Sequence, residues 1–159
     1  MEFEDLMAAF GRELGIPELG QGRDGVCNIE VDGMSVSFMA MSRTGQLVTW
    51  ADVCVAPPEG REQLYQMLME AMFMGRATAG GSFSIDRETG NVYLHRFDTL
   101  QTLDLDSFKA MLEKFVNVLE EWRQRIADFR PDATVSTVLS DQPGGNMPGG
   151  FGLGGFLQV

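Results

Sequence analysis

The chain has 159 residues, which is enough for one domain with a hydrophobic core, and 44% of them are hydrophobic and 22% charged, as in an ordinary globular protein. Twelve Lys and Arg against 23 Asp and Glu give a formal net charge of -11. Such a surface repels phosphate backbones and anionic lipid head groups, so nucleic acid and membranes are disfavoured as partners.

The N-terminal segment predicts an amphipathic helix. Its apolar residues fall at the spacings of one helical stripe: Phe3, Leu6, Met7, Phe10 and Leu14. Gly15 then supplies a C-terminal stop, and Pro17 prevents the helix from resuming. Phe10 and Leu14 are therefore expected near the end of the helix, pointing the same way.

An antiparallel meander is predicted next, because the apolar period changes to two. Strands are expected over residues 27–31, 34–40 and 47–55. Asp32-Gly33 predicts a two-residue hairpin turn, since both central positions of that turn favour a positive φ.

Four apolar residues in this meander lie on the strand faces that the alternation predicts to be polar: Met39, Met41, Val48 and Trp50. Two interpretations remain open. Either a helix covers this face as well, or the four side chains form an exposed apolar strip that meets a partner.

The second predicted helix spans residues 61–74 and is apolar nearly all round. The side expected to face the core carries Leu64, Met67, Leu68, Ala71 and Met72, and the rest of the surface carries Tyr65, Met69, Phe73 and Met74. One core in a chain this short covers one side of a helix. We therefore expect the other side to meet its own copy in a symmetric dimer, the alternative being a helix buried within one protomer.

The remaining elements are a second hairpin and a long final helix. Strands are expected over residues 82–86 and 92–97, and a helix from the N-cap Asp104 to about residue 129. The order helix, three strands, helix, two strands, helix predicts an α+β fold with an antiparallel sheet and helices, α-β-β-β-α-β-β-α. We place the domain at residues 1–130 and a glycine-rich C-terminal tail at 131–159.

No catalytic or metal-binding motif emerges from the sequence. His95 is the single histidine and has no nucleophile motif nearby, and Cys27 and Cys54 have no metal-ligand spacing, so we expect reduced thiols in a cytoplasmic protein. Residues 75–81 lack the Gly-Lys-Ser/Thr end of a phosphate loop and precede a strand instead of a helix. We predict no catalytic residue, no metal site and no cofactor.

Several stretches, taken in this order, resemble the class I type III secretion chaperone family, typified by the Tir chaperone, over roughly residues 1–125. The most specific one is similar to a family helix that ends in an aromatic residue and a glycine before a small-residue loop, and it runs through residues 68–75 and 78–81. The other stretches that resemble the family are residues 14–19, 29–33, 85–86, 89–90, 92–96, 112–117 and 121–122, together with Phe108.

The resemblance implies a homodimer in the bacterial cytoplasm that binds the chaperone-binding segment of a secreted effector and keeps it soluble and secretion-competent. The expected dimer residues, from the second helix, are Leu64, Tyr65, Leu68, Met69, Met72 and Phe73. The expected effector-binding residues, from the first helix and first three strands, are Phe10, Leu14, Ile29, Val31, Val36, Phe38, Met39, Met41, Val48 and Trp50. The family commonly adds an effector strand to a sheet edge.

Two other function classes stay open. Another α+β protein-binding module, such as an immunity or adaptor protein, would use the same apolar strip, and a small enzyme or ligand-binding domain would use a pocket near His95. The tail adds a separate hypothesis, because the family does not require it. Its apolar end, residues 151–157, would lie over an apolar groove in the free protein and yield to the effector, so that deleting the tail would raise effector affinity.

Overall fold

The computed structural model describes residues 2–16, 19 and 25–131. The elements, in chain order, are α1 (Phe3–Leu14), β1 (Val26–Val31), β2 (Met34–Met41), β3 (Gln46–Val55), α2 (Arg61–Ala71), β4 (Ser82–Ile85), β5 (Asn91–Thr99) and α3 (Leu105–Ala127), with short 3₁₀ turns at Phe73–Gly75 and Leu100–Thr102. This order confirms the predicted α+β fold. The predicted tail lies outside the described residues, except for Pro131.

The five strands form one antiparallel sheet in the order β1-β2-β3-β5-β4. Asp32 and Gly33 both have a positive φ, of 50° and 76°, which confirms the predicted hairpin between β1 and β2. β3 and β5 are neighbours in the sheet although α2 and β4 separate them in the sequence. β1 and β4 are consequently the two edge strands.

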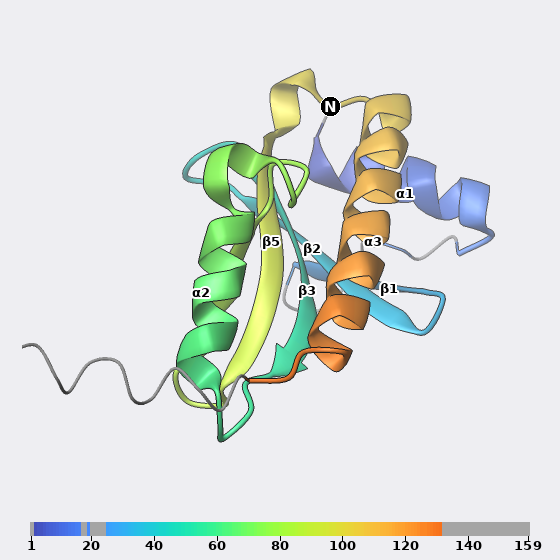
Figure 1. Ribbon diagram of the computed structural model, residues 1–159. Coiled ribbons are helices and arrows are strands. Elements are labelled where there is room, and N and C mark those ends of the chain that lie inside the picture. Colours follow the sequence, from blue (N-terminus) through green and yellow to red (C-terminus); the bar gives the residue numbers. More distant parts are fainter. Residues whose placement is uncertain (1, 17–18, 20–24, 132–159) are drawn as a thin grey trace, which may run out of the picture.

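The helices gather on one face of the sheet (Figure 1). α2 and α3 lie side by side across it, and α1 packs against α3. The ring of Phe108 in α3 meets the rings of Phe10 and Phe38 edge-on, with centroids 5.0 and 5.4 Å apart. At the other end of α3, the buried Trp122 indole donates a 2.7 Å hydrogen bond to the Ala77 carbonyl. Aromatic contacts thus fix both ends of α3 to the layers beneath.

α2 is shorter than predicted. It ends at Ala71, and the chain then tightens into a 3₁₀ turn in which Met74 has a left-handed φ of 57°. The Met72 sulfur accepts the backbone N–H of Phe83 in β4 at 3.1 Å. This contact and the glycine at position 75, with φ of 65°, turn the chain toward β4 before the predicted end of the helix.

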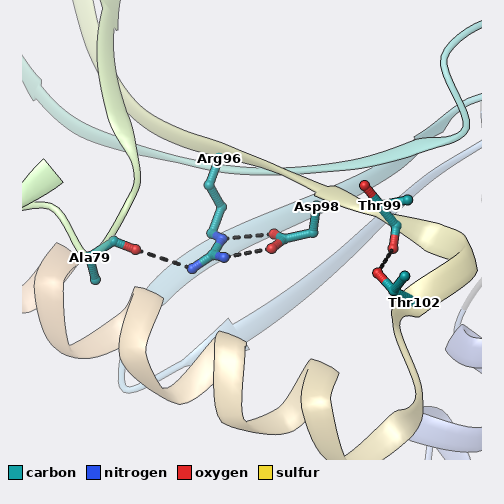
Figure 2. Close-up of polar contacts among 5 residues, drawn as sticks. All are labelled: Ala79, Arg96, Asp98, Thr99 and Thr102. Carbon is teal, nitrogen blue, oxygen red and sulfur yellow. Dashed lines mark hydrogen bonds and ion pairs between the residues drawn. The ribbon is translucent and has the colours of Figure 1, made fainter. Parts of the chain in front are cut away.

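A bidentate ion pair within β5 ties several segments together. The Arg96 guanidinium donates to both carboxylate oxygens of Asp98, at 2.5 and 2.7 Å, and to the Ala79 carbonyl ahead of β4 at 3.4 Å (Figure 2). The side chains of Arg96 and Asp98 are 18% and 17% exposed. Just after β5, the Thr102 hydroxyl closes the 3₁₀ turn on the Thr99 carbonyl at 3.1 Å. These bonds fix how the chain enters β4 and leaves β5.

The predicted N-cap of α3 is confirmed, because the Asp104 carboxylate accepts the Ser107 backbone N–H at 2.8 Å. Hydrogen bonding from the Ser107 side chain, and then from its backbone N–H, lowers the pKa of Asp104. After α3, Pro131 packs directly on Gly60, where any Cβ would overlap the proline ring. The described chain therefore ends beside the start of α2.

Candidate functional site

An apolar groove, the edge groove, runs between β1 and the helices α1 and α3. Its volume is about 630 Å³. It is lined by Phe10, Leu14, Ile16, Ile29, Glu30, Val31, Asp32, Lys109, Leu112, Glu113, Val116 and Asn117. Most of these side chains are apolar, and each of the three elements supplies some of them.

The end of α1 shapes one wall of the edge groove. Gly15 adopts a left-handed φ of 72°, and the Ile16 N–H then bonds the Gly11 carbonyl at 2.7 Å. This cap leaves Leu14 49% and Ile16 45% exposed, while Phe10 is nearly buried and forms part of the floor. The glycine stop predicted from the sequence thus places two apolar side chains at the mouth of the groove.

β1 borders the same groove with a free edge. Within the described residues it pairs only with β2, and Val31 and Met34 flank the two-residue turn. A turn of this kind makes the flanking pair hydrogen-bonded, and pairs alternate from there, so Glu30 and Asn28 direct their N–H and C=O groups away from β2. An extended chain can pair with these groups and direct every second side chain into the groove beside Ile29.

The opposite edge of the sheet is less open. At β4, the Phe83 N–H already donates to the Met72 sulfur at 3.1 Å, and the end of α2 lies against the strand. At β4 one outward backbone donor is thus occupied, whereas β1 borders the edge groove and pairs only with β2 within the described residues.

The second surface, the sheet-face groove, lies over β2, β3, β4 and β5 on the side away from the helices. Its volume is about 550 Å³, and its lining is Met39, Met41, Val48, Trp50, Ser84, Tyr93, His95 and Phe97. Strand register brings these side chains together, since Val48 pairs with Met39 on one side and Phe97 on the other. None of the helices in the described ranges supplies a lining residue, which favours the exposed apolar strip over a helix-covered face.

His95 lines the sheet-face groove together with two other polar residues, Ser84 and Tyr93. It pairs with Trp50 across the strands, its Nδ1 lies 3.2 Å from the Ser84 hydroxyl, and its ring meets Phe97 edge-on with centroids 5.4 Å apart. Burial lowers the pKa of His95. Among the described residues no carboxylate hydrogen-bonds this imidazole, so the arrangement lacks the third group that orients a catalytic histidine.

The structure separates the ten predicted effector-binding residues into three groups. The edge groove contains Phe10, Leu14, Ile29 and Val31, and the sheet-face groove contains Met39, Met41, Val48 and Trp50. Val36 and Phe38 are fully buried in the core, which corrects their placement on a binding surface. The reason is parity, because alternate residues of β2 face the helices, where Phe38 packs on Phe108.

The grooves also contain residues that the sequence did not single out for binding. Ile16, Leu112 and Val116 line the edge groove, and Tyr93 and Phe97 line the sheet-face groove beside His95, which the sequence suggested only for the ligand-binding alternative. Leu112 and Val116 belong to the core stripe of α3, and their part in a groove depends on the packing of α1. The β5 residues point to the same face of the sheet as Trp50, but their position next to Trp50 is known only from the β3–β5 register.

The predicted dimer residues also divide. Leu64 and Leu68 are 0% and 2% exposed, so they belong to the core of the protomer and not to an interface. Tyr65 and Met72 are half-buried. Met69 and Phe73 are exposed, as is the neighbouring Met74, at 69%, 67% and 77%. These values rule out a helix that is buried on all sides within one protomer.

The described residues contain neither a group of three or more His, Cys, Asp and Glu side chains that could hold a metal ion nor a helix long and apolar enough to cross a membrane. Cys27 is buried and Cys54 half-buried, and both are free thiols. Burial is the main cause that raises the pKa of each, so neither is activated as a nucleophile.

Solved structures share this fold. A chain in the crystal structure of the ExsC–ExsE complex is 22% identical with a TM-score of 0.65, covering 78% of this chain and 96% of that one. A chain of the HopA1–SchA chaperone–effector complex is 18% identical with a TM-score of 0.65, covering 77% and 93%. The Yersinia pestis type III secretion chaperone SycH, in complex with a stable fragment of YscM2, gives 17% identity, a TM-score of 0.57, and coverage of 76% and 99%.

No curated protein sequence matches this chain significantly. The model of the Tir chaperone protein (CesT) family matches residues 5–123. That match begins in α1 and ends in α3, so it contains both grooves and every strand of the sheet. Because it covers well over half of the sequence, the chain belongs to the Tir chaperone protein (CesT) family.

Proposed function

We propose that the edge groove and the sheet-face groove together hold the chaperone-binding segment of a secreted effector. The protein is a type III secretion chaperone, which binds this segment and keeps it soluble and secretion-competent. The observation that carries the proposal is the edge groove, where an apolar trough lies beside a strand edge with free backbone groups. This combination suits an extended peptide, whose backbone gains hydrogen bonds while alternate side chains enter the trough.

Binding by this route is capture without chemistry. An unfolded effector segment loses conformational entropy when it becomes ordered, and burial of its apolar side chains must offset that loss. The two methionines and the aromatic rings of the sheet-face groove suit this task, because Met side chains adapt to different partner shapes. The binding step needs no nucleotide and no catalytic residue, and we place it in the bacterial cytoplasm.

We further propose that two copies associate through the exposed face of α2. Met69, Phe73 and Met74 are the most exposed large apolar side chains of the described chain together with Val55, and three of these four lie together at the end of α2. An apolar patch of this kind is typical of an isologous interface between identical chains. Light scattering should give twice the 17.5 kDa chain mass for the wild type, and one chain mass for the double variant Met69→Lys/Phe73→Lys.

The effector assignment is tested with N-terminal fragments of secreted proteins encoded beside this chain. We expect one fragment to co-purify with the wild type and to bind the double variant Leu14→Asp/Ile16→Asp at least about tenfold more weakly, because the new carboxylates occupy the mouth of the edge groove. Both side chains are already half-exposed, so the variant should fold normally.

Val55→Asp is the matched control, since it introduces a carboxylate at an apolar side chain that is 67% exposed and outside both grooves. Equal affinity of the two variants for the fragment would place the effector elsewhere. Co-purification of a toxin domain in place of a secreted N-terminal segment would favour an immunity or adaptor protein.

A further inference from the structure

The rim of the edge groove carries more negative than positive charge. Glu30, Asp32 and Glu113 line the groove, and all three are exposed. Within the described part of the chain, none of them makes an ion pair. Lys109 is the single cation of the lining, so the balance of charge at the rim depends on what Lys109 contacts.

Lys109 is already neutralised by its own neighbours. Its Nζ lies 2.7 Å from the Glu13 carboxylate and 3.9 Å from that of Asp106. The hydrogen bond to Glu13 is the main cause that raises the pKa of Lys109, so its charge is held in that contact. The three rim carboxylates, on β1, its hairpin turn and α3, are left without a compensating cation around one apolar trough.

From this arrangement we propose that the segment bound in the edge groove alternates apolar residues with Lys or Arg. This inference rests on the proposed function, in which an extended segment adds to the free edge of β1. In such a strand, alternate side chains enter the trough beside Ile29 and Val31, and the intervening ones lie on the other face, beside Glu30. Asp32 lies at the hairpin end of β1, and Glu113 lines the groove from α3.

The rest of the molecule supports a foreign basic segment as the occupant. Residues 132–159, the chain's own candidate for covering a groove, contain two aspartates and no Lys or Arg, so they bring no cation to this rim. The sheet-face groove has no Asp, Glu, Lys or Arg in its lining. A preference for basic residues is therefore a property of the edge groove and not of every apolar surface on the protein.

The test uses three fluorescein-labelled synthetic 12-residue peptides with the same apolar residues at alternate positions and Lys, Gln or Glu between them. Fluorescence anisotropy with the full chain is measured at 50 and 300 mM NaCl. We expect the Lys peptide to bind about tenfold more tightly than the Gln peptide at low salt, and the Glu peptide to bind most weakly. Added salt should reduce the difference between the Lys and Gln peptides.

A net charge of -11 attracts any basic peptide, so a matched control is required. In the rim variant Glu30→Gln/Asp32→Asn/Glu113→Gln, the Lys and Gln peptides should bind within about twofold of each other. The control variant removes the same charge at exposed acids elsewhere, with the changes Glu59→Gln, Glu62→Gln and Glu88→Gln, and should keep the preference. If the preference for the Lys peptide over the Gln peptide falls equally in both variants, the inference is overturned, because the preference then depends on the overall charge of the protein.

The outcomes also separate this inference from the proposed function. If the Gln peptide binds as well as the Lys peptide, and Leu14→Ser weakens both, the groove binds extended segments without selecting charge, and only the inference fails. If Leu14→Ser changes the binding of none of the peptides, the edge groove is not the binding site, and the inference fails together with that assignment.

Discussion

The edge groove and the sheet-face groove offer a partner different means of binding, although both are apolar troughs of similar volume. The edge groove adds free backbone groups of β1 and three uncompensated carboxylates to its apolar floor. The sheet-face groove lies mainly over strands that are paired on both sides, and its one titratable polar floor group besides Tyr93 is His95. The edge groove can select an occupant by its chain direction, register and charge, whereas the sheet-face groove can select mainly by shape and apolar area.

Phe108→Ala should have a large effect, because it removes a core contact on which the edge groove rests. Phe108→Ala removes the ring on which Phe10 and Phe38 pack, and should lower the free energy of unfolding by about 3–5 kcal/mol. Phe97→Ala, in the sheet-face groove, removes a ring that is 48% exposed and should cost less than about 1 kcal/mol. Urea unfolding followed by circular dichroism measures both. Similar losses would mean that the two grooves do not differ in their dependence on the core.

The fold was largely predictable from the sequence because local signals agreed along the chain. Apolar spacing located every helix and strand, and Gly15, the Asp32-Gly33 turn and Asp104 marked three boundaries that the structure confirms. The end of α2 was wrong by three residues. It depends on a contact with Phe83, eleven residues beyond Met72 and on another element, which local spacing cannot reveal.

The grooves were predictable only in part, for a related reason. Periodicity indicates which residues share a face, and it correctly grouped Met39, Met41, Val48 and Trp50. It does not indicate which face the helices cover, so Val36 and Phe38 were assigned to a surface although both are buried and Phe38 packs on Phe108 of α3. In the same way, Leu64 and Leu68 were assigned to an interface although the protomer already buries them.

Substitutions at Asn28 test how much the free backbone groups of β1 contribute to binding in the edge groove. Asn28→Pro removes an N–H that points away from β2, and Asn28→Ala keeps it. Both variants lose the 2.6 Å hydrogen bond from the Ser37 hydroxyl to the Asn28 side chain, so they differ in the free backbone donor. We expect the proline variant to bind an effector segment about tenfold more weakly than the alanine variant.

Trp50 provides the matched readout for the other groove. It lines the sheet-face groove, whereas Trp122 is 2% exposed and bonded to Ala77, so a change in fluorescence on binding reports on Trp50. If strand addition is confined to β1, the proline variant should still give the Trp50 signal at a higher effector concentration. A loss of affinity equal in the proline and alanine variants would mean that the side chain, and not the strand edge, holds the effector.

A smaller effect is expected from pH, through the single histidine of the sheet-face groove. Burial among Trp50 and Phe97 lowers the pKa of His95 below its ordinary value of about 6.5, so the folded chain favours the neutral ring. The stabilisation is fully present above the unfolded pKa and is lost as the pH falls toward the folded value, where the ring must take up a proton.

An apolar effector side chain placed over His95 removes more water from the ring and lowers its pKa further, so binding there should weaken as the pH falls from 7 to 5. The lining contains no Asp, Glu, Lys or Arg, and Ser84 is neutral, so His95 dominates this titration within the groove. We expect a loss of roughly twofold to fivefold in affinity, followed through Trp50 fluorescence. His95→Gln, which keeps a polar group of similar reach but cannot titrate, should abolish this pH dependence. An unchanged pH profile in His95→Gln would contradict the assignment, because the titrating group would then lie outside the sheet-face groove.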